Sequence, residues 1–176
     1  MMKNQWYVLL SAVLAGAALV FTGCGKGGEK TSEKVAEKLV ERSLKKSGAK
    51  DADVDMAKGK MKFKTNEGEF EMDTGAGVAL PADFPKDVAS VKAAKVQMAM
   101  KTPQGFLVQM RASDDKAKVA EAFGEDMQAK GWEQEASVEM DDVSSRSFKK
   151  NKRQVTLVAS KGDEGTEIML TVAAEE

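Results

Sequence analysis

The fold is decided by residues 53–73, which read DVDMAKGKMKFKTNEGEFEMD. Apolar and charged residues alternate here with a period of two, which is typical of strands with one buried face. The interruptions at Lys58-Gly59 and Asn66-Glu67-Gly68 have the composition of tight turns. The stretch therefore predicts a three-stranded antiparallel meander with one apolar face.

The segment before the meander, residues 31–47, has a helical period instead. Its apolar residues recur on one side of a helix: Val35, Ala36, Leu39, Val40 and Leu44. Thr31 or Ser32 suits the start of the helix, and Gly48 suits its end. We expect the apolar side to pack on the meander. The alternative is contact with a membrane surface, which the three glutamates and the lack of aromatic residues disfavour.

An apolar run lies further upstream and ends at the only cysteine, in LAGAALVFTGC at residues 14–24. Lys3 gives this segment the positive start of a secretory signal. Phe21-Thr22-Gly23-Cys24 resembles the lipobox of bacterial lipoproteins, with phenylalanine where leucine is usual. The resemblance implies cleavage between Gly23 and Cys24 and a lipid anchor on Cys24. It also implies a place in the cell envelope, facing the periplasm from the outer membrane because Gly25 is not aspartate. The alternative is an ordinary signal or an uncleaved anchor.

The composition excludes several classes of function. The chain has 27 basic and 28 acidic residues, so its net charge offers no attraction for nucleic acid. It has no histidine and only one cysteine, which excludes Ser-His-Asp and Cys-His catalysis and most zinc sites. Carboxylate-only and Ser-Lys mechanisms survive this test. We find no catalytic, cofactor-binding or metal-binding constellation, and we expect a protein that is not an enzyme.

Residues 75–90 interrupt the periodic pattern of the chain, because they contain Gly75, Gly77, Pro81 and Pro85. We expect a linker whose apolar residues Leu80, Phe84 and Val88 press onto the folded body. The predicted division of the chain is therefore a signal at 1–23, a tether at 24–30, a helix with a β-meander at 31–74, the linker at 75–90, and a second module at 91–176.

The second module has a ββαβββ pattern. Strands are expected over residues 91–100 and 104–111, and a helix over 113–130 that Ser113 caps and Gly131 ends. Three further strands are expected at 133–140, 155–159 and 168–172, with 147–150 leading into a turn. The predicted fold class is α+β, with two helices packed on antiparallel sheet.

Methionine is frequent and allows two interpretations. Met98 and Met100 alternate with Val96, so we expect their side chains to point into the core. The alternative is a cuprous copper site made of thioethers. A calcium loop at Asp51, Asp53 and Asp55 is excluded, because methionine and lysine stand where such loops need glycine and glutamate.

Three stretches carry a second resemblance: KMKFKTNEGEFEM at residues 60–72, LPADFPKDV at 80–88 and AKGW at 129–132. They are similar to a widespread set of uncharacterised bacterial lipoproteins. In those proteins a helix and short strands precede an LPxDFPxDVP-like linker, and a ββαβββ module follows whose helix ends in a GW pair. The resemblance implies the same arrangement here and brings no active site with it. Ala89 departs from the pattern, since the family tends to have proline there.

The best local charge feature is a basic turn, KKNKR at 149–153. Its cations are candidates for contact with lipid phosphate or an acidic partner: Lys149, Lys150, Lys152 and Arg153. The alternative is a solvated hairpin tip.

The leading interpretation is a membrane-anchored envelope lipoprotein that works as a non-catalytic binding or interaction module, with an envelope protein, peptidoglycan or lipid as its partner. The alternative is a carrier of a small apolar or amphiphilic ligand in the periplasm. A cavity of about 300 Å³ or more between sheet and helix would favour the carrier. A filled core with an exposed apolar strand edge would favour the contact module.

Overall fold

A computed structural model describes residues 29–174 of the chain. The helices are α2 (Glu29–Lys46) and α3 (Lys116–Ala129). The strands before α3 are β1 (Lys50–Asp55), β2 (Lys60–Thr65), β3 (Gly68–Thr74), β4 (Lys95–Thr102) and β5 (Gly105–Ala112). The strands after it are β6 (Glu133–Glu139), β7 (Val143–Lys150), β8 (Arg153–Gly162) and β9 (Gly165–Ala174).

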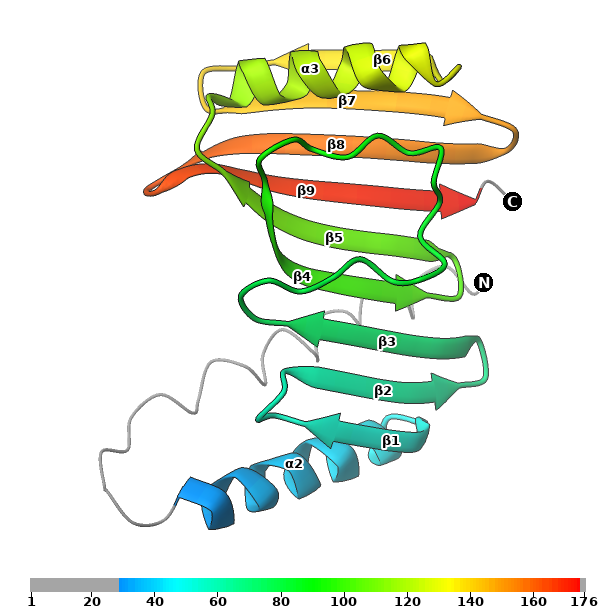
Figure 1. The fold of residues 1–176 in the computed structure, drawn as a ribbon. Helices are drawn as coiled ribbons and strands as arrows, with labels where there is room; N and C mark the ends of the chain where they lie inside the picture. The colour runs from blue at the N-terminus through cyan, green and yellow to red at the C-terminus, as the bar shows by residue number, and fades with distance from the viewer. Residues whose placement is uncertain (1–28, 175–176) are drawn as a thin grey trace.

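The nine described strands form one antiparallel sheet in the order β1-β2-β3-β4-β5-β9-β8-β7-β6 (Figure 1). The predicted meander is β1–β3, and its turns lie where the sequence places them. β3 pairs with β4, so the strands on both sides of the predicted linker belong to the same sheet. The α+β class with helices on antiparallel sheet is confirmed, and the fold is richer in strand than expected.

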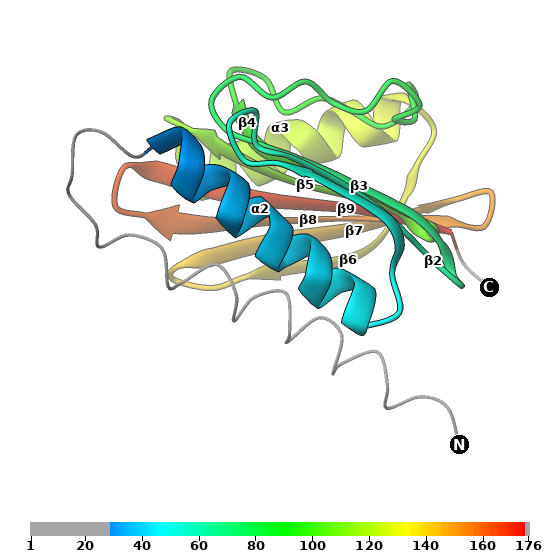
Figure 2. The same ribbon diagram turned by 90° about the horizontal axis from the view of Figure 1, so that it is seen from below.

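The two helices lie on opposite faces of the sheet (Figure 2). α3 covers the face formed by β6, β7 and β8, while α2 runs along β1 at the far end. Residues 75–94 connect β3 to β4 and cross the α3 side of the sheet (Figure 1), and we call them the strap. The other face of the central strands has no helix over it among the described residues.

The core lies between α3, the strap and the central strands. Phe123 of α3 meets Phe148 of β7 edge to face, with ring centroids 5.8 Å apart. The strand residues beneath them alternate inward as expected: Val108, Met110, Val155, Leu157, Ala159, Ile168, Leu170 and Val172. This core holds the sheet rigid under the strap, because close-packed side chains resist displacement.

α3 begins two residues later than predicted. Asp115, not Ser113, is its cap, and the Asp115 carboxylate accepts the backbone N–H of Ala117 at 2.9 Å. The cap backbone is extended, which is the conformation that an N-cap requires. Gly131 follows the helix with φ of 78°, so the predicted glycine end is confirmed.

The predicted ββαβββ pattern is short by one strand, because four strands follow α3. Residues 147–150, predicted only to lead into a turn, belong to the strand β7, which begins at Val143. Its first inward-facing residues, Ser144 and Arg146, are polar, so the sequence shows no hydrophobic alternation there. Ser144 is nevertheless completely buried.

The expectation that Met98 and Met100 point into the core is wrong. A bulge at Gln97 shifts the register between Val96, which pairs with Met110, and Met98, which pairs with Gln109. Since side chains alternate along a strand, the extra residue turns Ala99 inward and both methionines to the opposite face. Ala99 is 3% exposed, and Met98 is only partly buried.

Two other apolar sets are less buried than expected. On α2 the residues that face β1 are partly buried, but Val35 and Leu39 are more than half exposed. On β6 the apolar residue Val138 is exposed, as is Met140 just after the strand, because β6 is an edge strand whose second face has no cover among the described residues.

Candidate functional site

The strap is a chain of short turns held against the sheet. Backbone hydrogen bonds run from Phe84 to Pro81 at 2.9 Å and from Val88 to Pro85 at 3.2 Å. Proline suits such turns because its φ is already fixed. Val88 is buried, as predicted. Phe84 also presses onto the body as predicted, with its ring edge-on to Phe106 at 5.3 Å.

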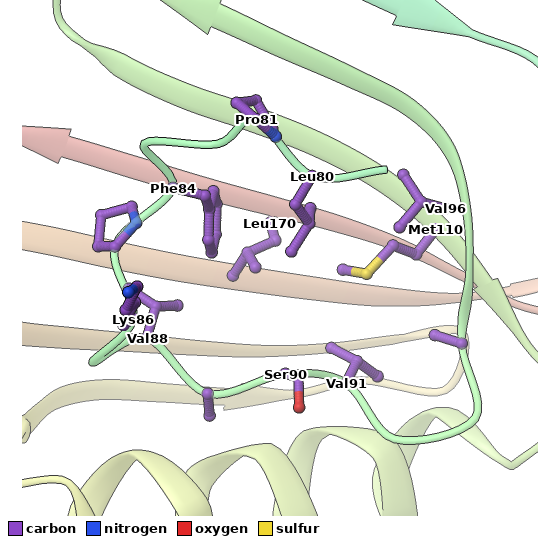
Figure 3. A pocket seen from close by; sticks show the side chains of 13 residues that line it. Leu80, Pro81, Phe84, Lys86, Val88, Ser90, Val91, Val96, Met110 and Leu170 are labelled. Atoms are coloured by element: carbon purple, nitrogen blue, oxygen red, sulfur yellow. The ribbon is translucent and has the colours of Figure 1, made fainter. Parts of the chain in front are cut away.

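A cavity of about 390 Å³ lies between the strap and the sheet (Figure 3). The sheet contributes Val96 from β4, Met110 from β5 and Leu170 from β9. The other ten of its thirteen lining residues come from the strap. Leu80 is a strap residue that points into this space, and it is 38% exposed although the sequence predicts it to pack down. The cavity therefore replaces the tight packing expected at this end of the strap.

The lining is apolar apart from two side chains, Lys86 and Ser90. Neither is a nucleophile with a base beside it, so the arrangement favours binding over covalent chemistry. Apolar walls with few polar groups are typical of small-molecule sites, and the volume falls in their usual range of about 300–1,000 Å³. The sequence predicts the apolar residues of the strap but not that they leave a hollow.

One carboxylate, Asp87, holds the middle of the strap in place. Both its oxygens accept hydrogen bonds from the Arg153 guanidinium, at 3.0 and 2.6 Å. Lys150 lies 3.6 Å away, and the Trp132 indole N–H donates to the Asp87 carbonyl at 2.8 Å. Arg153 also lies over the Trp132 ring, 5.0 Å from its centroid. We call these four residues the Asp87 cluster.

The charges of the Asp87 cluster are mutually stabilised. Hydrogen bonds from Arg153 hold the pKa of the Asp87 carboxyl below its usual value, against the opposing effect of burial. The same pair raises the pKa of Arg153. A bidentate guanidinium–carboxylate pair adds geometric precision, so the cluster fixes the strap in position as well as in charge.

Two of the three stretches that carry the resemblance to uncharacterised lipoproteins meet at this cluster. Asp87 belongs to LPADFPKDV, and Trp132 belongs to the GW pair after α3. Ala89, which departs from the family pattern, donates its backbone N–H to the Met127 sulfur at 3.2 Å. Proline has no N–H and would not form that bond.

The structure places the four cations of the basic turn in two groups. Arg153 and Lys150 belong to the Asp87 cluster, and the Lys150 ammonium also donates to the Lys130 carbonyl at 2.6 Å. Lys149 approaches Glu135 at 4.0 Å, while Lys152 is exposed at the tip of the turn. The turn therefore serves partly to hold the strap, a role that the sequence did not indicate.

A second polar cluster joins the start of α3 to the sheet edge. The buried Ser144 hydroxyl donates to Glu139 at 2.6 Å, and Lys116 donates to Glu139 at 2.7 Å and to Ser144 at 3.3 Å. This brings together a serine, a lysine and a carboxylate that the sequence keeps apart. Ser144 has no exposed surface, and none of the three residues lines the strap cavity. The cluster fits a structural role.

Three further questions from the sequence concern metal binding, membrane-spanning helices and the lipid anchor. Among residues 29–174 the structure has no group of three or more histidine, cysteine, aspartate or glutamate side chains placed to hold a metal ion. No helix in this part of the chain is long and apolar enough to cross a membrane. Gly23, Cys24 and the cleavage between them lie outside the described residues, so the signal and the lipid anchor stay predictions.

Comparison with known proteins gives one match. A family model described as START domain-like matches residues 96–168, which run from β4 into β9 and include Val96 and Met110 of the cavity wall but not Leu170. No curated protein and no solved structure matches the chain. The match covers less than half of the chain and is compatible with a ligand-binding module built on helix and sheet.

Proposed function

We propose that the protein is a non-catalytic binding module of the bacterial envelope, which holds a small apolar or amphiphilic ligand in the strap cavity. The observation that carries this proposal is the 390 Å³ hollow with apolar walls between the strap and β4, β5 and β9. The START domain-like match over the same strands supports it. The lipobox-like segment supports the proposed location in the envelope, with Cys24 as the lipidated residue.

The test uses the full chain in its own membranes, with photo-leucine replacing leucine during growth. Leu80 and Leu170 line the cavity, whereas Leu39 is exposed on α2. After irradiation, we expect small-molecule adducts on the peptides that contain Leu80 or Leu170, detected by mass spectrometry. Adducts that are equally frequent on Leu39, or absent from both cavity leucines, would contradict the proposal.

A filling variant gives the second arm of this test. Ala94 lines the cavity, so Ala94→Phe should occupy part of the space and reduce the adducts. Ala136→Phe is the matched control, because Ala136 is exposed on the edge strand β6. Unchanged adducts in Ala94→Phe would place the ligand elsewhere.

The membrane anchor has its own test. Cys24→Ser removes the only thiol, so we expect the protein to leave the membrane fraction and lose its acyl mass. Retention of the variant in washed membranes, with no change in mass, would favour an uncleaved hydrophobic anchor.

A second candidate function is contact with a partner protein through the sheet edge. It is favoured by the edge strand β6, because Val138 on this strand is 45% exposed and Met140 just after it is 60% exposed. An extended segment of a partner pairs with such an edge through backbone hydrogen bonds. Crosslinking in cells from a photo-reactive residue at Val138 tests it, with the same residue at Lys58, on the turn between β1 and β2, as control.

The basic turn is better tested at Lys152 than by reversing all four cations. Arg153 and Lys150 contact Asp87, so their reversal would also release the strap. Lys152→Glu changes an exposed charge alone. An unchanged set of crosslinked partners in this variant would remove the turn tip as an interface.

A further inference from the structure

The rim of the strap cavity carries a cation that has no partner in the described part of the chain. Lys86 lines the cavity and is exposed, and its ammonium takes part in no ion pair or hydrogen bond within residues 29–174. Other lysines near the strap are paired: Lys92 with Asp126 at 3.0 Å, and Lys101 with Asp83 at 2.5 Å. An unpaired ammonium beside apolar walls leaves the cavity with one apolar end and one charged end.

A second ammonium contacts the backbone of Lys86. The Lys130 side chain donates to the backbone carbonyl of Lys86 at 3.0 Å, and it has no carboxylate partner within residues 29–174. Lys150 and Arg153 lie beyond it and share a single carboxylate, Asp87. Lys86, Lys130, Lys150 and Arg153 are thus gathered around the middle of the strap near one carboxylate, Asp87, so this part of the protein has an excess of positive charge.

We propose that the ligand of the strap cavity is a single-chain amphiphile with an anionic headgroup, whose chain lies against Phe84 and Leu170 and whose headgroup meets Lys86. This inference rests on the proposed function and adds the chemical class of the ligand. The apolar volume of about 390 Å³ suits one alkyl chain with on the order of ten carbons. A carboxylate or phosphate headgroup would gain from the charge at the rim, whereas an alcohol would not.

The test compares two photoactivatable probes on the full chain in native membranes: a diazirine-bearing decanoic acid and the decanol of the same design. We expect the acid to label the peptides of residues 80–94 about three- to fivefold more than the alcohol, which is the range for one exposed charge contact. Competition with unlabelled decanoate and with decyl phosphate shows which anionic headgroup is preferred.

Lys86→Gln is the deciding variant, because its ammonium makes no described contact and its loss should leave thermal unfolding unchanged. We expect it to abolish the preference for the acid while labelling by the alcohol stays the same. Lys152→Gln removes an exposed lysine at the turn tip and serves as control.

The outcomes separate the two proposals. Equal labelling by acid and alcohol, or a preference that survives in Lys86→Gln, would overturn the anionic headgroup and leave the binding function standing. Failure of both probes to label residues 80–94 above the level in Ala94→Phe would overturn the binding function, and the headgroup with it.

Discussion

Asp87 joins parts of the chain that lie far apart in the sequence. Its carboxylate contacts Arg153, which is 66 positions further along, and its carbonyl accepts from Trp132. The carboxylate is about one-third exposed, so solvent weakens the charge contribution without removing the geometric one. Asp87 therefore ties the strap both to β8 and to the end of α3.

Asp87→Asn should lower the free energy of unfolding by about 1–2 kcal/mol, because a charged bidentate contact is replaced by a weaker neutral one. Urea denaturation measures the change. Asp141→Asn is the control, since Asp141 is exposed and makes no described contact, and it should change stability by less than about 0.5 kcal/mol. An Asp87→Asn variant as stable as the control would contradict the role given to this pair.

A substitution at Gly124 should instead stabilise the protein. It lies inside α3, and a Cβ added there would meet Phe148 and Gln134 at 3.8 and 3.7 Å, which is ordinary contact. Gly124→Ala should therefore raise the free energy of unfolding by up to about 1 kcal/mol through helix propensity. Gly131→Ala should lower it, because Gly131 has φ of 78°. Destabilisation by Gly124→Ala would mean that α3 packs closer to the sheet than the structure has it.

At the scale of elements, the strap should respond to pH. The pKa of Asp87 is lowered by Arg153, and that of Asp83 by Lys101. Each pair therefore adds stability above the unfolded carboxyl pKa of about 4, and that stability is lost as pH falls through the lower folded values. Hydrogen-exchange protection at Val88 should fall relative to β9 between pH 6 and 3. A constant ratio would show that the carboxylates do not hold the strap.

The elements themselves were largely predictable from local pattern. The meander, the hairpin at 95–112 and both helices follow from period, turn residues and terminal glycines. The start of β7 was not predicted, because its buried residue Ser144 is polar and donates a hydrogen bond to Glu139. Local hydrophobicity does not indicate such a bond.

The site could be predicted only in part. The sequence indicated that the strap packs on the body, since Phe84 and Val88 are apolar at helical spacing in a proline-rich segment. Neither the cavity nor the Asp87 cluster has a local signal, because their walls come from β4, β5, β8 and β9 as well. The inverted side chains of Met98 and Met100 follow from a single bulge residue, which alternation alone does not reveal.

At the scale of the whole molecule, stability should be uneven along the sheet. All the buried core residues but two lie between Val88 and Val172, and the two exceptions are Ala49 and Val54. The meander β1–β3 is joined to the rest of the sheet by four residue pairs between β3 and β4. The meander has few buried side chains, so its local opening should cost less free energy.

Native-state hydrogen exchange should therefore show β1 and β2 opening at a lower free energy than β5, β8 and β9. Valine-to-alanine variants separate the two regions further. Val155→Ala should lower the exchange free energy of the core strands, whereas Val54→Ala should affect the meander alone. A single exchange free energy for all nine strands would show one cooperative unit instead.

The last strand of the sheet has a consequence for how the protein behaves at high concentration. β6 leaves one row of backbone donors and acceptors unpaired by any described strand, the kind of row on which fibrils grow by addition of further chains. It carries Glu133, Glu135 and Glu139 along that row. Lys116 pairs with Glu139 and Lys149 approaches Glu135, so Glu133 is the carboxylate on this strand that would most oppose a second copy arriving at the same edge.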